Sequence, residues 1–320
     1  MSTAFAQICL VATLFITDVG LAMNFRGASD SVSCHSIIQS SFQEKDSQIC
    51  ATVAGIPIRT KFIESRVDKA TKKFSLSQRR KEQLFELQLK IYIDQIIVMN
   101  FLQSKNFGAQ DSELKLEWNR LQARLDRVGK AMEDYLAEND LTEDELRREL
   151  EWKLCWKKYL DNKIDDPFLQ EHFDRSPRKF DGTELRVAHL LVKKGAAKSP
   201  SELAENIKKQ LSDQKLIWAE AVRKYSQAPT RESEGALGWI RWQGSMPENF
   251  THAAFELKTL EISQPVETRF GVHLIRCLEV KQGKMGFLDA KDLVRQDAEK
   301  QLFAAIAAKH RKAVSIERIK

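Results

Sequence analysis

The chain has 320 residues, of which 42% are hydrophobic and 30% are charged, with only 13 Gly and 7 Pro. This composition is typical of a helix-rich folded protein and excludes a disordered or fibrous one, and the length suffices for two domains. The net charge of +6 comes from 51 basic and 45 acidic residues. Most basic runs have acidic residues within one helical turn, so binding to nucleic acid is not expected.

The first 23 residues form the most apolar stretch of the chain, and small residues near Ala22 are typical of a secretory signal. Two features argue against this interpretation. No Lys or Arg precedes Arg26, and Asp18 interrupts the apolar run, which also argues against a stable membrane span. We interpret residues 1–35 as a candidate signal or leader segment, cleaved after Ala22 if the protein is exported.

The cysteines stand at scattered positions and fit neither a metal-binding pattern nor a disulfide framework. They are Cys9, Cys34, Cys50, Cys155 and Cys277. A disulfide between Cys34 and Cys50 is left open. A metal site built from His252, His273 and Cys277 is not expected, because His273 and Cys277 lie about 13 Å apart at the usual rise per strand residue. The sequence therefore predicts no metal and no cofactor.

The first half of the chain after the leader is mostly helical. Residues 49–58 predict a short extended segment with a turn at Gly55. Apolar residues at spacings of three and four then predict amphipathic helices. These helices cover 76–102, 114–128, 132–140 and 142–160. Thr142 and Glu145 form a capping box for the last of them, and Asp166-Pro167 predicts the start of another helix.

Residues 175–182 are interpreted as a linker, after which the apolar period changes from helical to strand-like. The predicted elements are a strand at 184–192, helices at 199–211 and 216–225, an irregular loop at 226–246, a short helix at 248–257, and a strand, turn and strand at 261–280. This order predicts an α+β domain of about 100 residues. Residues 288–313 return to a helical pattern and are expected to fold back onto the N-terminal helices.

Six segments between residues 184 and 281 occur in the order found in parvulin-type peptidyl-prolyl isomerases. They are RVAHLLVK, YSQ, GALGW, MPENF with AAFELK, EISQPV and TRFGVHLI. Residues 184–281 therefore resemble a parvulin domain. The stretch from Val53 to Lys163 resembles the helical N-terminal domain of the SurA and PrsA type of extracytoplasmic foldase, in which a C-terminal helix completes a helical chaperone body.

These resemblances imply a fold in which a parvulin-like α+β domain is inserted between an N-terminal helical domain and a C-terminal helix. The expected domains are a helical chaperone domain at 36–178, an isomerase domain at 179–284 and a C-terminal helix at 285–320. The wide apolar face of the 76–102 helix is expected to be buried over much of its circumference. In a foldase, the apolar faces of this helix and its neighbours are also expected to form a cradle for apolar client segments.

The resemblance implies that His189 and His273 face each other beneath a proline-binding cleft, with Thr268 in the same hydrogen-bonded network. Strand alternation places Val187, His189 and Leu191 on one face. A hydroxyl that holds one imidazole, which in turn holds the next, would satisfy buried rings and set their tautomers. Two interpretations stay open, a direct catalytic role and a role only in shaping the cleft.

The residues implied to bind substrate are apolar. Leu237, Met246 and Phe250 match the family positions that accept the pyrrolidine ring, and Phe270 is expected to add a wall. Trp239 either binds an apolar peptide or packs within its loop.

One implied catalytic position departs from the family pattern, because Ala228 stands where parvulins usually carry Asp or Cys. A methyl group supplies neither charge nor a hydrogen bond, and Glu232 or Glu234 is left open as a substitute. Isomerisation of an X-Pro bond rotates an amide across a barrier of roughly 18–20 kcal/mol and breaks no bond, so no nucleophile is required.

The expected function is that of a peptidyl-prolyl cis-trans isomerase and folding chaperone whose partners are unfolded or proline-containing polypeptides. The alternative is a non-catalytic chaperone or peptide-binding protein with a degenerate parvulin domain, which Ala228 favours. The expected location is the periplasm or cell envelope, with the cytoplasm as the alternative, and the oligomeric state is left open.

Overall fold

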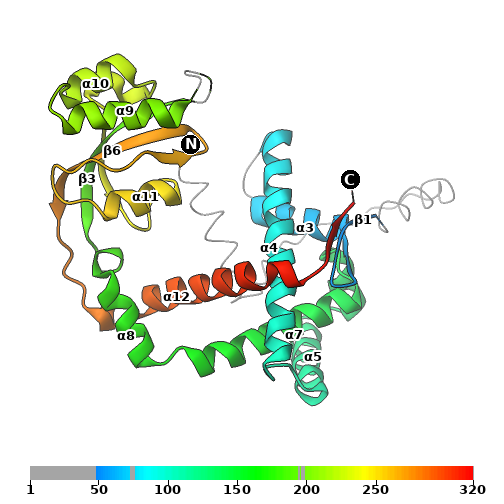
Figure 1. Ribbon diagram of the computed structural model, residues 1–320. Helices are drawn as coiled ribbons and strands as arrows, with labels where there is room; N and C mark the ends of the chain where they lie inside the picture. The colour runs from blue at the N-terminus through cyan, green and yellow to red at the C-terminus, as the bar shows by residue number, and fades with distance from the viewer. Residues whose placement is uncertain (1–47, 73–75, 194, 196–198, 320) are drawn as a thin grey trace. The chain divides into compact units, whose positions relative to one another are not determined.

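The computed structural model describes residues 48–72, 76–193, 195 and 199–319 (Figure 1). The predictions for residues 1–35, including cleavage after Ala22 and a disulfide to Cys34, lie outside these residues. The described chain forms two compact units. We call Asp166–Gln296 the four-stranded unit, and the residues up to Asp165 together with those from Asp297 onward the helical unit.

The helical unit contains the predicted hairpin and helices. In chain order its elements are β1 (Ile49–Val53), β2 (Ile56–Arg59), α3 (Thr60–Thr71), α4 (Gln78–Ser104), α5 (Asp111–Asp126), α6 (Met132–Glu138) and α7 (Glu143–Lys163). Thr142 caps α7 by accepting a hydrogen bond from the Glu145 backbone N–H, and the Glu145 carboxylate accepts from the Thr142 N–H. The predicted capping box is thus confirmed.

A third strand of the helical unit comes from the other end of the chain. β7 (Ile316–Arg318) pairs antiparallel with β1, so that the sheet order is β2-β1-β7. The sequence analysis missed this strand, since three residues are too few to show an alternating pattern.

The second half of α12 (Phe287–His310) also belongs to the helical unit. The Phe303 ring meets Trp152 and Trp156 of α7 edge-on, at centroid distances of 5.8 and 6.0 Å. This confirms that the C-terminal helix folds back onto the N-terminal helices.

The apolar face of α4 is the centre of the core in the helical unit. Its Ile93 and Ile97 pack with Ala51 of the hairpin and Phe62 of α3 in one buried cluster. Each fully buried side chain of this size contributes about 1.5–3 kcal/mol relative to exposure. The prediction that this face is buried is confirmed. The buried α4 residues are covered by the rest of the unit, and the expectation that this helix and its neighbours form a cradle for clients stays a prediction.

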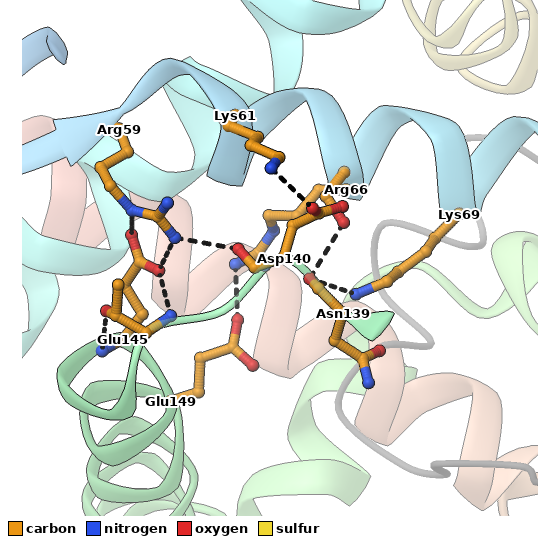
Figure 2. A network of polar contacts seen from close by, with 10 residues as sticks. Arg59, Lys61, Arg66, Lys69, Asn139, Asp140, Glu145 and Glu149 are labelled. Atoms are coloured by element: carbon orange, nitrogen blue, oxygen red, sulfur yellow. Dashed lines mark hydrogen bonds and ion pairs between the residues drawn. The ribbon is translucent and has the colours of Figure 1, made fainter. Parts of the chain in front are cut away.

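Ion pairs join α3 and the end of β2 to the start of α7 (Figure 2). Arg59 donates through Nε and Nη2 to the carboxylate of Glu145, whose side chain is 4% exposed. Arg66 donates to Glu149 at 2.9 Å. Removing one partner of a buried ion pair costs about 3–5 kcal/mol, whereas exposed pairs contribute about 0.2–1 kcal/mol. The ion pair between Arg59 and Glu145 therefore contributes most of the electrostatic stabilisation of this junction.

The four-stranded unit is built around one antiparallel sheet. Its elements are α8 (Asp166–Arg175), β3 (Glu184–Val192), α9 (Pro200–Ser212), α10 (Trp218–Tyr225), β4 (Ala236–Arg241), α11 (Glu248–Phe255), β5 (Val266–Thr268) and β6 (Gly271–Lys281). The strand order is β4-β3-β6-β5. Helices α9 and α10 cover one face of the sheet and α11 covers the other (Figure 1).

Alternation along β3 divides the core of this unit into two layers. Ala188, Leu190 and Val192 pack under α9 and α10, whereas Leu185 and Val187 pack with α11. His189 follows the odd-numbered residues and therefore lies on the α11 face.

The prediction of an irregular loop at 226–246 is wrong. The stretch contains a 3-10 helix at Pro229–Ser233 and the edge strand β4. Its strand pattern is hidden, because Gly238 has a φ of +80° and four of the six β4 residues are exposed. The element order is thus β-α-α-β-α-β-β. This order is that of an α+β domain, and helical segments precede and follow it in the sequence. The predicted fold class is therefore confirmed.

In the part of the chain that the structure describes, no helix is both long and apolar enough to cross a membrane.

Candidate functional site

Two histidines meet on the α11 face of the sheet. In the β3–β6 ladder His189 is opposite Ile275 and His273 is opposite Leu191, so the two rings are diagonal neighbours. The Nδ1 atoms of His189 and His273 are 3.1 Å apart, and the rings stack with a centroid distance of 5.3 Å. The residues are 8% and 4% exposed.

Hydroxyl groups bind the outer nitrogen of each imidazole. Thr268, at the end of β5, has its Oγ1 2.8 Å from His273 Nε2. At the other end, Thr230 Oγ1 lies 3.1 Å from His189 Nε2. The structure thus forms one chain of hydrogen bonds in the order Thr268, His273, His189, Thr230. It brings together the three predicted residues, and it adds Thr230, which the sequence analysis missed.

Burial keeps both imidazoles neutral. Desolvation lowers the pKa of His189 from 6.5 to about 4. The pKa of His273 is lowered to about 4, mainly by desolvation and further by the neighbouring His189. A neutral imidazole carries one N–H and one acceptor nitrogen, so each ring donates on one side and accepts on the other. The chain of hydrogen bonds therefore has a single direction along its whole length.

Phe250 packs against both histidines. Its ring lies edge-on to His189 and His273 at centroid distances of 6.0 and 5.5 Å, and the residue is 1% exposed. Leu237 and Met246 are partly buried and pack against the same cluster. The structure thus brings Phe250 to the histidines, and Leu237 and Met246 to the apolar cluster that contains Phe250.

The two other predicted substrate-binding residues lie differently. Phe270 is half exposed in the turn after β5, where its backbone N–H donates to Thr268 Oγ1 at 3.1 Å. Trp239 is opposite Arg186 in the β3–β4 ladder. Directly paired residues share a sheet face, so the Trp239 side chain lies on the face opposite to His189. The structure therefore does not bring Trp239 to the histidines, and its role in binding a peptide stays a prediction.

Ala228 directly precedes the 3-10 helix and is 5% exposed. Its backbone N–H donates to Ser226 Oγ at 3.3 Å, and its side chain offers no polar group. Both Glu232 and Glu234, which the sequence analysis left open as substitutes, are exposed. The group that contacts His189 Nε2 is instead the hydroxyl of Thr230. A hydroxyl residue two positions after Ala228 was the sequence signal that could have revealed it.

Within the described ranges, no group of three or more His, Cys, Asp or Glu side chains is placed to hold a metal ion.

The family of this segment follows from comparison with known proteins. A family model described as the PPIC-type PPIASE domain, Rotamase, matches residues 187–279. With the paired histidines in its sheet, this segment is a parvulin-type peptidyl-prolyl isomerase domain. The resemblance predicted from the sequence is confirmed.

The wider chain is similar to PrsA foldases. The foldase protein PrsA of Bacillus subtilis (strain 168) is 31% identical over 149 residues, which are 46% of this chain and 47% of that protein. The foldase protein PrsA of Clostridium botulinum (strain Loch Maree / Type A3) is 28% identical over 247 residues, 72% of this chain and 70% of that protein. The similarity therefore extends beyond the isomerase domain, yet it spans less than half of the Bacillus subtilis protein.

Among solved structures, peptidylprolyl isomerase PrsA from Bacillus anthracis is 24% identical with a TM-score of 0.40, covering 70% of this chain and 94% of that one.

The lowered histidine pKa values predict a loss of stability in mild acid. Between pH 6.5 and 4 the folded four-stranded unit binds fewer protons than the unfolded chain, so the stability present above pH 6.5 is lost as the pH falls toward 4. At pH 5 the loss is about 2 kcal/mol per histidine relative to pH 7. Urea unfolding at both pH values, followed by NMR signals of β3 and β6 amides, measures it.

The double variant His189→Asn with His273→Asn should lose most of this pH dependence, whereas His252→Asn, in the same unit, should keep it. An equal pH dependence in the wild type and the double variant would contradict the assignment to these two rings.

Proposed function

We propose that the chain is a peptidyl-prolyl cis-trans isomerase and folding chaperone that acts on X-Pro bonds of unfolded polypeptides. The observation that carries this proposal is the hydrogen-bonded pair His189 and His273 above Phe250, within the segment matched by the isomerase family. The names of the similar PrsA proteins, which are foldases, support the chaperone part.

The chemistry requires stabilisation of a twisted amide and no covalent intermediate. Rotation removes the resonance that makes the peptide bond planar, which leaves a basic prolyl nitrogen and a carbonyl without conjugation. Leu237 and Met246 contact the pyrrolidine ring and exclude water. The neutral imidazoles hold donors in place without an opposing charge. Interactions that are stronger with the twisted amide than with either planar isomer lower the barrier.

The isomerase proposal predicts cis/trans exchange on short X-Pro peptides, measured by NMR exchange with the full chain. Met246→Ala should lower kcat/KM about tenfold, because a loss of roughly 1.4 kcal/mol of ring contact changes a rate by that factor. Ile217→Ala is the matched control, since Ile217 is 59% exposed and precedes α10 on the other side of the sheet, and it should leave the rate unchanged.

A folded wild-type chain without exchange activity would refute the isomerase proposal. It would favour the alternative of a non-catalytic peptide-binding domain, for which Ala228 is the supporting residue.

The domain boundaries predicted from the sequence, 36–178, 179–284 and 285–320, stay part of the proposal. The register of the sheet supports an inserted isomerase domain. Glu184 at the start of β3 is directly opposite Lys281 at the end of β6, and Lys281 Nζ donates to the Glu184 carboxylate at 3.0 Å. Paired strand residues lie about 5 Å apart, so the inserted segment begins and ends at neighbouring points.

The chaperone proposal predicts that a chain lacking residues 184–281, closed by a short linker, still suppresses aggregation of an unfolded client in light scattering. The α4 face is internal, so clients would contact exposed apolar residues of the helical unit, such as Leu116 and Val128. A deletion chain that keeps its helical circular dichroism but leaves aggregation unchanged would show that the helical unit is not the chaperone.

The proposal places the protein outside the cytoplasm, in the periplasm or cell envelope. The apolar residues 1–23 and the similarity to PrsA foldases support this location. Mass spectrometry of the protein from its native host should find a chain that begins after Ala22. An intact Met1 or Ser2 at the N-terminus would argue against export by this route.

A further inference from the structure

We propose that Thr230 is a catalytic residue of the isomerase site, whose hydroxyl donates a hydrogen bond to the nitrogen of the twisted X-Pro amide. This inference rests on the proposed isomerase function and assigns a role to a residue outside the predicted site. The contact that motivates it is the 3.1 Å distance between Thr230 Oγ1 and His189 Nε2.

The direction of the hydrogen-bond chain follows from the contacts of Thr268. Its hydroxyl has one proton and two neighbouring acceptors, His273 Nε2 at 2.8 Å and the Gly271 carbonyl oxygen at 3.4 Å. A hydroxyl donor strongly favours the shorter contact. Thr268 also accepts from the Phe270 backbone N–H at 3.1 Å, which leaves its own proton for His273.

That first bond determines all the others. Because Nε2 of His273 accepts, its Nδ1–H donates to Nδ1 of His189. The remaining proton of His189 is then on Nε2, and it is donated to Thr230 Oγ1. Thr230 therefore receives a hydrogen bond and keeps its own O–H proton to donate. Hydrogen bonds aligned in one direction polarise each other, which makes the last hydroxyl a better donor.

The backbone around Thr230 is held rigidly against β3. The Thr230 carbonyl accepts from the Gly235 N–H at 2.8 Å and from Ser233 Oγ at 3.0 Å. Gly235 in turn accepts through its carbonyl from the His189 N–H at 2.9 Å. Gly235 has a φ of +79°, and a Cβ there would lie 2.0 Å from the His189 carbonyl oxygen. The hydroxyl is thus positioned before a peptide binds, as an effective donor must be.

The location of Thr230 fits a donor to the substrate. It is only partly buried, and it follows by two residues Ala228, whose side chain offers no polar group. His189 contacts Thr230 on one side and Phe250 on the other. A prolyl ring bound beside His189 would therefore bring its nitrogen toward the hydroxyl. The planar amide nitrogen has no free lone pair to accept this bond, and the twisted one has, so the bond stabilises the transition state selectively.

The test compares Thr230→Val, which keeps the shape and removes the hydroxyl, with Thr230→Ser, which keeps the hydroxyl. Ser201→Ala is the control, because it removes an exposed hydroxyl group from α9, which covers the other face of the sheet. Cis/trans exchange is measured on one X-Pro peptide with the full chain. We expect kcat to fall at least about tenfold in Thr230→Val with KM nearly unchanged, and to stay within about threefold of wild type in the other two variants.

A second readout is the tautomer of His189, measured from the ¹⁵N signals of its ring. A hydrogen-bond chain directed from Thr268 to Thr230 requires the His189 proton to be on Nε2 in the wild type and in Thr230→Ser. In Thr230→Val the ¹⁵N signal of His189 Nε2 should shift, because the acceptor hydroxyl is lost. Full activity in Thr230→Val, activity in Thr230→Ser as low as in Thr230→Val, or a wild-type proton on Nδ1 of His189 would overturn the proposal. A wild type without exchange activity would instead refute the isomerase function. The ¹⁵N ring signals would still show the direction of the hydrogen-bond chain.

Discussion

The hydrogen bond between two uncharged imidazoles, His189 and His273, is the interaction on which the site depends. It cannot form if both rings are protonated, since two imidazolium rings at this distance would both be donors and would repel each other. The surrounding structure keeps the rings dry. Phe250 closes one side, the sheet closes the other, and each outer nitrogen meets a hydroxyl. The fold thus supplies polarity without charge, which suits a reaction that redistributes electrons within an amide and transfers none.

The sheet determines which groups meet at this site. β3 and β6 are the inner strands, so their histidines are shielded by neighbours on both sides, while the outer strands and their loops supply the hydroxyl groups. Thr268 comes from the end of β5, and Thr230 comes from the segment that leads into β4. The site therefore combines two central rings with hydroxyl groups from the edges of the sheet, of which Thr268 is buried and Thr230 is partly exposed.

Much of this arrangement could be predicted from the sequence, and the failures have physical causes. Long amphipathic helices, the Thr142 capping box and the strand that carries His189 have strong local patterns, so they were found. β4 was missed because an edge strand with most side chains exposed has no apolar alternation. The sheet face of Trp239 depends on that register, and the contact of Thr230 is with a ring distant in sequence, so neither is visible in a local pattern. For the α4 face the pattern is clear but has two meanings, since a face buried in the core and a face that binds clients have the same apolar spacing.

The pairing of β7 with β1 has a consequence for biosynthesis. The sheet of the helical unit contains both the earliest and the latest described strands, whereas the four-stranded unit is continuous from Asp166 to Gln296. A ribosome releases the whole isomerase domain before it releases the residues that complete the helical unit. During synthesis, the growing polypeptide therefore carries a complete isomerase domain while the helical unit still lacks its last strand.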